Sequence, residues 1–410
     1  MTPKIEHKPE VLEILSTGIT GQFASTVEVS RTKMPEFKAG NTIDNEYLAT
    51  VSEIDISMVT AIVFSLLGLL LGFDAVNGER RTGTLKYILS NQVPRFKLLL
   101  SKCLGGIAVI ILSLIIGFIF CLILMLNSSG IALNLGLWLR IGGFFVTSLL
   151  YASTFYMLGI LLSVSFKEPA AALAFSLFFW VVLVVIWPGT ARYLGKQLIP
   201  VQTLESMKEN DGFKPLEIQE VLKLWGDFSK AENLPDFFDL GNDGSFSFGG
   251  SGEIYQSLLD YLYDRVDIVQ EEVQKQTDRE WQIRSAHYAY MMKQQNFIHL
   301  ISCISPAYLF DYTSSILCRT DSGSYGIFID NVNEYRRQFL QWLVDIDAMH
   351  SQKWFVQDGD LDLSGLPEYS PISESFVQSL NRAAIPAAML ILINLVFFFC
   401  AHLIFFRSDV

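Results

Sequence analysis

The sequence predicts an all-α polytopic membrane protein, and its composition supports this fold class in three ways. Hydrophobic residues make up 51% of the 410 residues, and 31 residues are phenylalanine, which is more than soluble domains usually contain. The apolar residues gather in five runs, each of which can cross about 30 Å of hydrocarbon as one helix. These runs contain no Asp, Glu, Lys or Arg, whereas a helix in a soluble domain usually keeps a polar stripe.

The five predicted spans follow these apolar runs and cover residues 57–73, 104–126, 141–164, 169–187 and 384–406. One run of this length could also form the central helix of a large soluble domain. Five such runs in a single chain favour the membrane interpretation.

Basic residues crowd into the connection between the first two predicted spans, at Arg80, Arg81, Lys86, Arg95, Lys97 and Lys102. Because basic residues accumulate in short cytoplasmic loops, this connection, residues 74–102, is predicted to be cytoplasmic. Alternation of the spans then predicts an outer N-terminal segment, four spans, an outer domain, and a last span with a cytoplasmic tail, at residues 1–55, 56–187, 188–383 and 384–410.

The N-terminal segment is placed outside by this alternation, although residues 1–55 contain no signal peptide and no apolar run that could carry them across. We therefore expect a further spanning helix to precede Met1 in the intact protein. The alternative is a short tail that is translocated without help, and the mixed charges of the segment argue against it.

The outer domain is predicted to be mainly helical, because apolar residues recur there at helical spacing. The repeat includes Ile254, Leu258, Leu262, Val266, Val269 and Val273. Residues 188–383 are numerous enough to bury a core of their own, so we expect an ordered cap. Substrate binding, contact with an envelope partner and shielding of an exit are all compatible with such a cap.

Several function classes lack support in the sequence. The net charge of -12 argues against nucleic-acid binding, which requires a basic surface. The chain has no Gly-x-x-x-x-Gly-Lys-Ser/Thr motif, so we expect no phosphate-binding loop and no ATP hydrolysis by this chain. No ionisable residue lies near the middle of a predicted span, unlike in proton- or sodium-driven carriers. Without clustered His or Cys ligands, we expect neither a metal nor a cofactor.

The most informative segment follows the first predicted span. Gly83 can break or turn the chain, and the hydroxyl of Thr84 can cap the turn that follows. Leu85, Ile88 and Leu89 then share one apolar face, which predicts a short helix on the cytoplasmic side. Asn91 and Pro94 are expected to end this helix.

Two interpretations of this short helix are possible. A loop that anchors to anionic lipid headgroups would explain the basic residues. A coupling helix would also explain the acidic residue, the glycine and the threonine, because it would present a small apolar knob to a groove in a soluble partner. Its charged neighbours would then fix the orientation of that partner.

The segment resembles the cytoplasmic loop of permease subunits of ABC-2 type transporters, in particular bacterial members with large extracytoplasmic loops. The residues that match the pattern in order are Glu79, Gly83, Thr84, Leu85, Pro94, Arg95 and Lys102. The order of the spans and the segment Ile304–Phe310 extend the resemblance over nearly the whole chain. Members of this family normally have a cytoplasmic tail and a first span ahead of this point, so the resemblance also implies a missing sixth span.

The resemblance implies the membrane-spanning subunit of an ATP-driven exporter in a bacterial inner or plasma membrane. Expected partners are ABC ATPase subunits, a second permease copy or homologue, and membrane lipid. The residues expected to couple the chain to the ATPase are Glu79, Arg80, Arg81, Gly83, Thr84, Leu85, Ile88, Leu89 and Arg95. Fold-level analogy cannot choose the transported substrate.

Two other functions compete with export. In the first, a non-transporting ABC complex drives an envelope process through the outer domain. In the second, the chain is a membrane-embedded enzyme or receptor without an ATPase partner, but no group of catalytic residues at the membrane surface supports it.

Two residue pairs have structural interpretations. Gly68 and Gly72 form a Gly-x-x-x-Gly step in the first span, which permits close approach of a helix from the same chain or from a second copy. Cys303 and Cys318 both lie in the outer domain and could form a disulfide in an oxidising compartment. Free buried thiols are the slightly favoured alternative for this pair.

Overall fold

The computed structural model describes residues 3–6, 10–18, 24–29, 36–39, 55–91, 93–126, 134–214, 238–240, 246–248, 253–345 and 365–407. Within these residues, five helical stretches are long and apolar enough to cross a membrane: Ile56–Thr82, Arg95–Ile123, Leu135–Ser165, Pro169–Leu198 and Phe376–Arg407. The predicted all-α polytopic fold with five spans is therefore confirmed.

The first span is built from α2 (Ile56–Val59), the π-helix η2 (Thr60–Phe64) and α3 (Ser65–Gly72). The second and third spans are single helices, α6 (Arg95–Leu126) and α7 (Leu135–Ser165). The fourth joins α8 (Pro169–Trp180), the π-helix η3 (Val181–Ile186) and α9 (Trp187–Leu198), and the fifth is α15 (Phe376–Arg407).

The second to fifth spans are longer than the apolar runs that predicted them. Helix α6 begins at Arg95 and α15 begins at Phe376, ahead of the predicted starts at residues 104 and 384. The fourth span continues to Leu198, beyond the predicted end at residue 187. Hydropathy marks the part of a helix that can lie in hydrocarbon, whereas backbone hydrogen bonding continues into polar sequence.

Helix α7 is the centre of the bundle. Its apolar window is 72% buried, against 11–33% for the windows of the other four spans. It packs on α3, α15, α6 and α8, and Phe144, Tyr151 and Phe155 on it are almost fully buried. The remaining spans therefore meet one another largely through α7.

The Gly-x-x-x-Gly step of the first span packs inside the chain. A Cβ atom on Gly68 would lie 2.6 Å from the carbonyl oxygen of Ala152, and one on Gly72 would lie 2.5 Å from that of Tyr156. Both carbonyls belong to α7, so only glycine permits this backbone approach. The structure therefore places both glycines against α7 of the same chain, the first of the two arrangements that the sequence permits.

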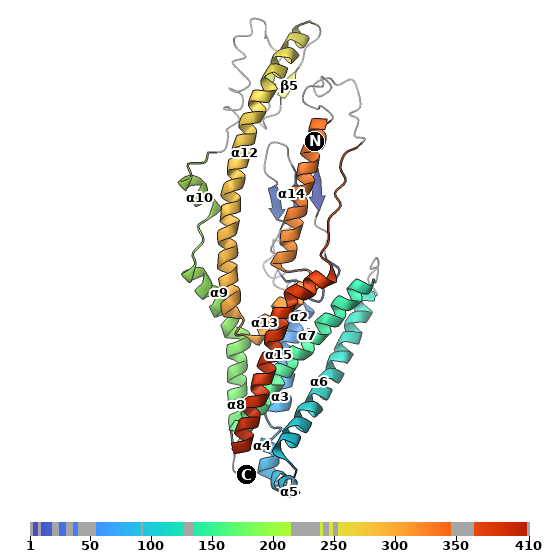
Figure 1. Cartoon of the computed structure of the whole chain (residues 1–410), viewed down its shortest axis with the longest axis vertical. Helices are drawn as coiled ribbons and strands as arrows, with labels where there is room; N and C mark the ends of the chain where they lie inside the picture. The colour runs from blue at the N-terminus through green and yellow to red at the C-terminus, as the bar shows by residue number, and fades with distance from the viewer. Residues whose placement is uncertain are drawn as a thin grey trace.

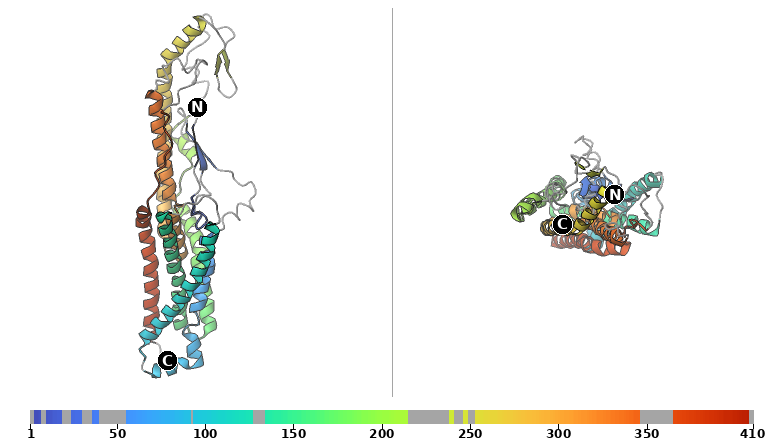
Figure 2. Two further views of the ribbon diagram at one scale, coloured as in Figure 1. Left: turned by 90° about the vertical axis from the view of Figure 1, so that its right-hand side faces the viewer. Right: turned by 90° about the horizontal axis from the view of Figure 1, so that it is seen from above.

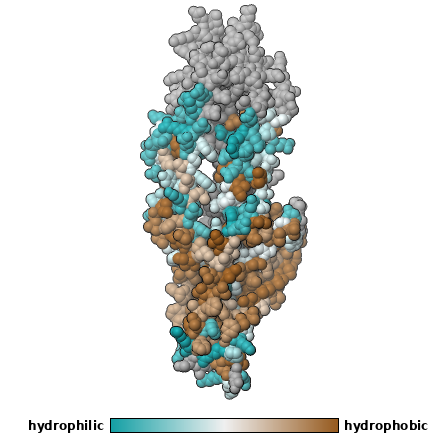
Figure 3. All heavy atoms as spheres, in the orientation of Figure 1, coloured by the Kyte–Doolittle hydropathy of each residue, from teal (hydrophilic) through white to brown (hydrophobic). Residues whose placement is uncertain are grey.

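The outside of the bundle is apolar. Large exposed side chains on α6 include Leu112, Ile116, Phe120 and Ile123, and the face in Figure 3 carries a hydrophobic band between two hydrophilic ends. Such an exposed band is what contact with hydrocarbon requires.

A projecting domain rises from one end of the bundle (Figure 1). Its long helices are α12 (Glu253–Ser302) and α14 (Ser322–Asp345), and α10 (Leu204–Asn210) lies beside α12. The strands β1 (Lys4–Glu6), β2 (Ala24–Glu28) and β3 (Glu36–Ala39) form one antiparallel sheet, and β4 (Phe238–Leu240) pairs with β5 (Phe246–Phe248). The domain is mainly helical, as predicted, and the sheets are an addition.

The three-stranded sheet packs on α14 through one apolar cluster. Ile5, Val27 and Val29 meet Phe328 and Val332 there. Because the sheet precedes the first span in the chain, its contact with α14 joins the N-terminal segment to a helix that follows four of the five spans.

Between α12 and α14 the chain turns back into the bundle as α13 (Pro306–Cys318). The hydroxyl of Ser305 accepts a hydrogen bond from the Tyr308 backbone N–H at the start of this helix (3.3 Å). Phe310 is fully buried and stacks on Tyr151 of α7 with ring centres 4.6 Å apart. The projecting domain is therefore interrupted by a helix that belongs to the bundle core.

The end opposite the projecting domain carries the short helices α4 (Asn77–Thr82) and α5 (Thr84–Ser90). The last turn of α15 lies at the same end (Figure 2). The basic residues of the predicted cytoplasmic connection gather here, and we call it the basic end.

Candidate functional site

The predicted short helix at the basic end exists. Helix α5 runs from Thr84 to Ser90 and is followed by Asn91 as its C-cap. Gly83 separates it from α4 with a φ of 76°, in the left-handed region. Because a side chain strains this backbone conformation, glycine is what permits the sharp turn between the two helices. We call α4, Gly83 and α5 the loop module.

The role predicted for the Thr84 hydroxyl is wrong. It makes no capping bond to its own helix; instead it donates to the carbonyl oxygen of Glu79 in α4 (3.2 Å) and lies 2.9 Å from the hydroxyl of Thr82. The left-handed turn brings the end of α4 beside the start of α5, so the hydroxyl binds a carbonyl in the last turn of the preceding helix, which the Thr82 hydroxyl also binds (3.3 Å).

The apolar face of α5 points inward, so the prediction that it projects toward a partner is wrong for Leu85. That side chain is fully buried in a cluster with Val76, Leu98 and Phe405, and Ile88 and Leu89 pack against the same cluster. Burying a leucine side chain stabilises by about 1.5–3 kcal/mol. The three residues therefore hold the loop module onto the spans.

Two polar contacts fix α4 on the bundle. Glu79 forms an ion pair with Lys102 of α6, and these side chains stay 25% and 31% exposed. The hydroxyl of Ser163, near the end of α7, accepts hydrogen bonds from the backbone N–H groups of Val76 (3.0 Å) and Asn77 (3.1 Å). The acid and the lysine of the sequence motif thus meet, and a serine satisfies the free N–H groups at the helix start.

Arg95 ties the start of α6 to the end of α15. Its guanidinium donates to the carbonyl oxygens of Phe405 and Phe406, at 2.8 Å each. The same group lies 5.8 Å from the ring centre of Phe405. A cation at a helix C-terminus satisfies free carbonyls and the negative end of the helix dipole, so Arg95 holds α15 rather than facing outward.

The outward face of the loop module is polar. It carries Arg81, Thr82, Lys86 and Tyr87, and Tyr87 is 76% exposed. Arg80 is half-buried, and its Nε and Nη2 atoms have no hydrogen-bond partner in the part of the chain that the structure describes. The structure therefore replaces the predicted apolar knob with a tyrosine among basic and hydroxyl side chains.

Cys303 and Cys318 carry free thiols and are buried. Burial raises the pKa of both thiols. A raised pKa disfavours the reactive thiolate, so the structure agrees with the alternative of free buried thiols.

Sequence reasoning missed Arg140, which lies in α7 near the projecting domain and is 5% exposed. Its guanidinium donates to the carbonyl oxygens of Leu317 and Glu374 and to the hydroxyl of Ser379, at 2.9 Å each. The sequence does contain a sign of this role, because Arg140 directly precedes a predicted span. A charge at that position is costly unless it is paired within the protein.

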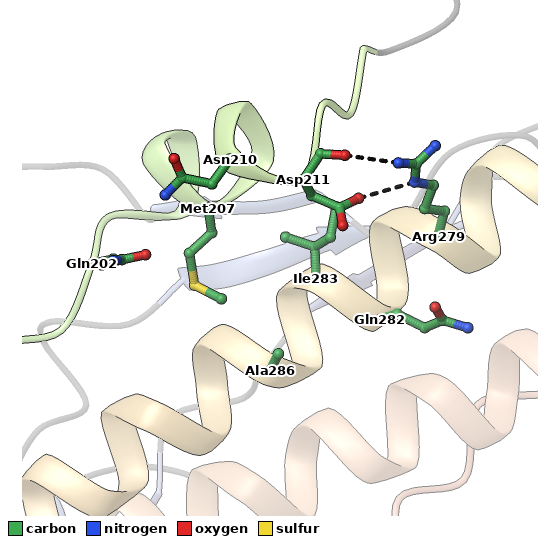
Figure 4. Close-up of a pocket in the computed structure, with 8 residues that line it drawn as sticks. All are labelled: Gln202, Met207, Asn210, Asp211, Arg279, Gln282, Ile283 and Ala286. Atoms are coloured by element: carbon green, nitrogen blue, oxygen red, sulfur yellow. Dashed lines mark hydrogen bonds and ion pairs between the residues drawn. The ribbon is translucent and has the colours of Figure 1, made fainter.

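A shallow pocket of ≈ 440 Å³ lies between α10 and α12 in the projecting domain. Its lining residues are Gln202, Met207, Asn210, Asp211, Arg279, Gln282, Ile283 and Ala286 (Figure 4). Arg279 donates from Nε to the Asp211 carboxylate (2.9 Å) and from Nη2 to the Asp211 carbonyl oxygen (2.8 Å). The charges of the pocket are thus engaged in holding α10 on α12.

The comparison with known families decides the class of the protein. The sequence model of the family described as "ABC-2 family transporter protein" matches residues 11–410. The chain belongs to the ABC-2 transporter family. The basic-end loop module, the five apolar helices and the position of the glycine turn are consistent with this membership.

Two curated relatives carry the same name, probable ABC transporter permease protein NosY. The protein from Stutzerimonas stutzeri is 32% identical over 139 residues, which are 33% of this chain and 49% of that protein. The protein from Pseudomonas aeruginosa is 34% identical over 140 residues, again 33% of this chain and 49% of that protein. The match spans about half the length of these relatives, and both are described as permeases.

Proposed function

We propose that this ABC-2 family chain is the membrane-spanning subunit of an ATP-driven exporter in the bacterial inner membrane, powered by a separate ATPase subunit. The observation that supports this proposal is the position of the loop module, which touches three spans at once. It contacts α7 through Ser163, α6 through Lys102, and the end of α15 through the buried Leu85 cluster.

In this proposal the ATPase binds the outward face of the loop module. Closure of the ATPase pair on ATP would displace α4 and α5, and their anchors would pass the displacement to α6, α7 and α15. Among the described residues, the Nε and Nη2 atoms of the half-buried Arg80 have no hydrogen-bond partner, and an unpaired buried polar atom costs about 1–3 kcal/mol. A rearrangement that gives Arg80 a partner would therefore be favourable.

The exposed Tyr87 provides the most direct test. Tyr87→Ala removes a large exposed side chain from the outward face without touching the buried cluster that holds α5. Truncation of a hot-spot tyrosine to alanine costs about 2 kcal/mol or more of binding free energy, so we expect at least tenfold weaker binding of the ATPase. Copurification from nanodiscs and ATP hydrolysis by the assembled complex are the measurements.

Tyr193→Ala is the matched control, because Tyr193 is 65% exposed on α9, away from the loop module. It should leave both readouts unchanged. Equal ATPase binding by wild type and Tyr87→Ala would contradict the proposed docking face. Failure of the purified chain to bind any ABC ATPase would contradict the proposed function as a whole.

Transport has its own test. An ATPase activity that rises when a translocated compound is added to reconstituted vesicles supports export. The competing envelope function instead predicts activity that responds to an envelope partner and not to a small compound.

A further inference from the structure

We propose that α12 and α14 form two arms, each attached at its base to a different span, and we call these attachments the roots. A shift between the two spans then changes the separation of the arms. The inference rests on the proposed function, because the loop module is the source of the shift. It assigns to the projecting domain the role of a moving element, and it assigns Arg382 as the residue that holds one arm to its span.

The arm α12 is rooted on the fourth span. The side chain of Gln294 donates to the carbonyl oxygen of Ile199 (2.6 Å), and the indole of Trp187 donates to that of Ile301 (3.1 Å). Between these bonds, a Cβ atom on Gly195 would lie only 2.1 Å from Cγ1 of Ile298. Gly195 thus lets α9 and α12 approach closely, and α12 follows the fourth span.

The arm α14 is rooted on the fifth span by charge. Asp321 precedes α14, and its carboxylate accepts from the backbone N–H of Gly323 (2.9 Å) and the hydroxyl of Ser324 (2.6 Å). Arg382 in α15 donates to both oxygens of the same carboxylate, at 2.5 and 3.1 Å. A bidentate pair of this kind fixes orientation as well as distance, so α14 follows α15.

Glu374, just ahead of α15, completes this root. Arg382 donates to its two carboxylate oxygens at 2.9 and 2.7 Å, and Arg140 donates to its backbone carbonyl. Asp321 and Glu374 are 4% and 9% exposed. Arg382 thus faces two buried carboxylates, because a buried charge requires a partner, and Arg140 holds the backbone beside one of them, which connects α7, α14 and α15.

The fifth span reaches the loop module at its other end, where Phe405 of α15 packs in the cluster of Leu85. Arg95 of α6 binds the last carbonyls of α15, and Asn394 fixes the middle of α15 to α7 through the carbonyl of Leu150 (3.0 Å) and the hydroxyl of Thr154 (2.7 Å). Among the described residues, α9 has no contact of this kind with the loop module. A displacement of α4 and α5 should therefore act on α15 more than on α9.

The arms are long, and side chains approach between them, since a Cβ atom on Gly326 of α14 would lie 3.8 Å from the hydroxyl of Tyr288 of α12. Helix α12 has 50 residues and α14 has 24, which correspond to about 75 and 36 Å at a rise of 1.5 Å per residue. Figures 1 and 2 show both helices extending away from the bundle. A small tilt at either root is therefore enlarged at the far ends.

Distance measurements between spin labels test the proposal in the assembled complex with its ATPase in nanodiscs. One pair, Ser285→Cys on α12 and Gln338→Cys on α14, reports the separation of the arms. A second pair, Asn91→Cys and Lys167→Cys, reports the position of the loop module. All four residues are exposed, and Cys400→Ser removes the one native cysteine that is not buried.

We expect both distances to change when a non-hydrolysable ATP analogue is added. The arm distance should change by more than the about 1–2 Å that packed helices usually shift. In Arg382→Gln the arm change should fall below half of the wild-type value, while the change at the loop module persists. Arg337→Gln is the matched control, because Arg337 is exposed and pairs with Glu334 in its own helix.

The outcomes separate the two proposals. If nucleotide changes the distance at the loop module but not the distance between the arms, this inference is overturned and the proposed function stands. A full arm response in Arg382→Gln would also overturn it. If nucleotide leaves the loop-module distance of the wild type unchanged, both this inference and the proposed function are overturned. If Arg382→Gln does not assemble, Asp321→Asn removes one carboxylate charge with little change of shape, and the same expectations apply to it.

Discussion

The two arms stand on the same end of the bundle, but their roots use different interactions. Gly195 and Ile298 join α12 to the fourth span by close apolar contact, whereas Arg382 and Asp321 join α14 to the fifth span by charge. Dispersion contacts have little directionality, while charge-assisted hydrogen bonds to a planar guanidinium fix an angle. The apolar root is held in addition by the hydrogen bonds of Gln294 and Trp187 to backbone carbonyls, whereas the charged root fixes both distance and angle.

The largest expected effect is the loss of Arg140, which holds the backbone beside the charged root. Arg140→Met should destabilise the protein by about 3 kcal/mol or more, because the carbonyl oxygens of Leu317 and Glu374 and the hydroxyl of Ser379 lose their buried donor. Thermal unfolding in detergent, followed at matched protein concentration, is the measurement. Arg81→Met is the control, since Arg81 is exposed, and it should change stability by less than about 0.5 kcal/mol. Equal melting of the two variants would contradict the role of Arg140.

A smaller effect is expected at the apolar root. Gly195→Ala places a methyl group against Ile298 and should cost about 1–3 kcal/mol by overpacking. Gly189→Ala, in the same helix, meets nothing within 4 Å and should stabilise by about 0.5–1 kcal/mol through the better helix propensity of alanine. Recovery of the melting temperature in the double variant Gly195→Ala/Ile298→Val would confirm the cause. If both single variants change the stability in the same direction, the proposed overpacking at Gly195 is contradicted.

The smallest effect is a pH dependence on the α12 side. Burial alone would raise the pKa of Glu280, but its bonds to Lys208 and Arg284 outweigh burial and hold that pKa below its ordinary value of 4.5. The stabilisation is therefore present above pH 4.5 and is lost as the pH falls through the folded-state pKa.

The variant Glu280→Gln tests this contribution. Between pH 5 and 7 it should melt below wild type by an amount that reflects about 1 kcal/mol or less, and the two proteins should converge in more acidic buffer. The variant Glu271→Gln is the control, because the Glu271–Lys275 pair is largely exposed. A difference between Glu280→Gln and wild type that persists unchanged in acid would contradict the assignment.

Local features of the candidate site were predictable from the sequence. The turn at Gly83, the helix that follows it and the basic character of that end depend on neighbouring residues only. The direction of the apolar face was not predictable, because a helical repeat shows which residues share a face and not what covers it. The tertiary structure covers Leu85 with Val76, Leu98 and Phe405, and it leaves Tyr87 on the outside.

By itself the sequence determined the number of spans, the helical fold class and the end at which the basic residues gather. These properties follow from hydropathy and charge, which are sums over adjacent residues. Only the tertiary structure decided that Arg140 meets Leu317, a residue 177 positions away, and that Gly68 and Gly72 face α7. Such contacts depend on the packing of whole helices, and no local pattern specifies which helix a given face will meet.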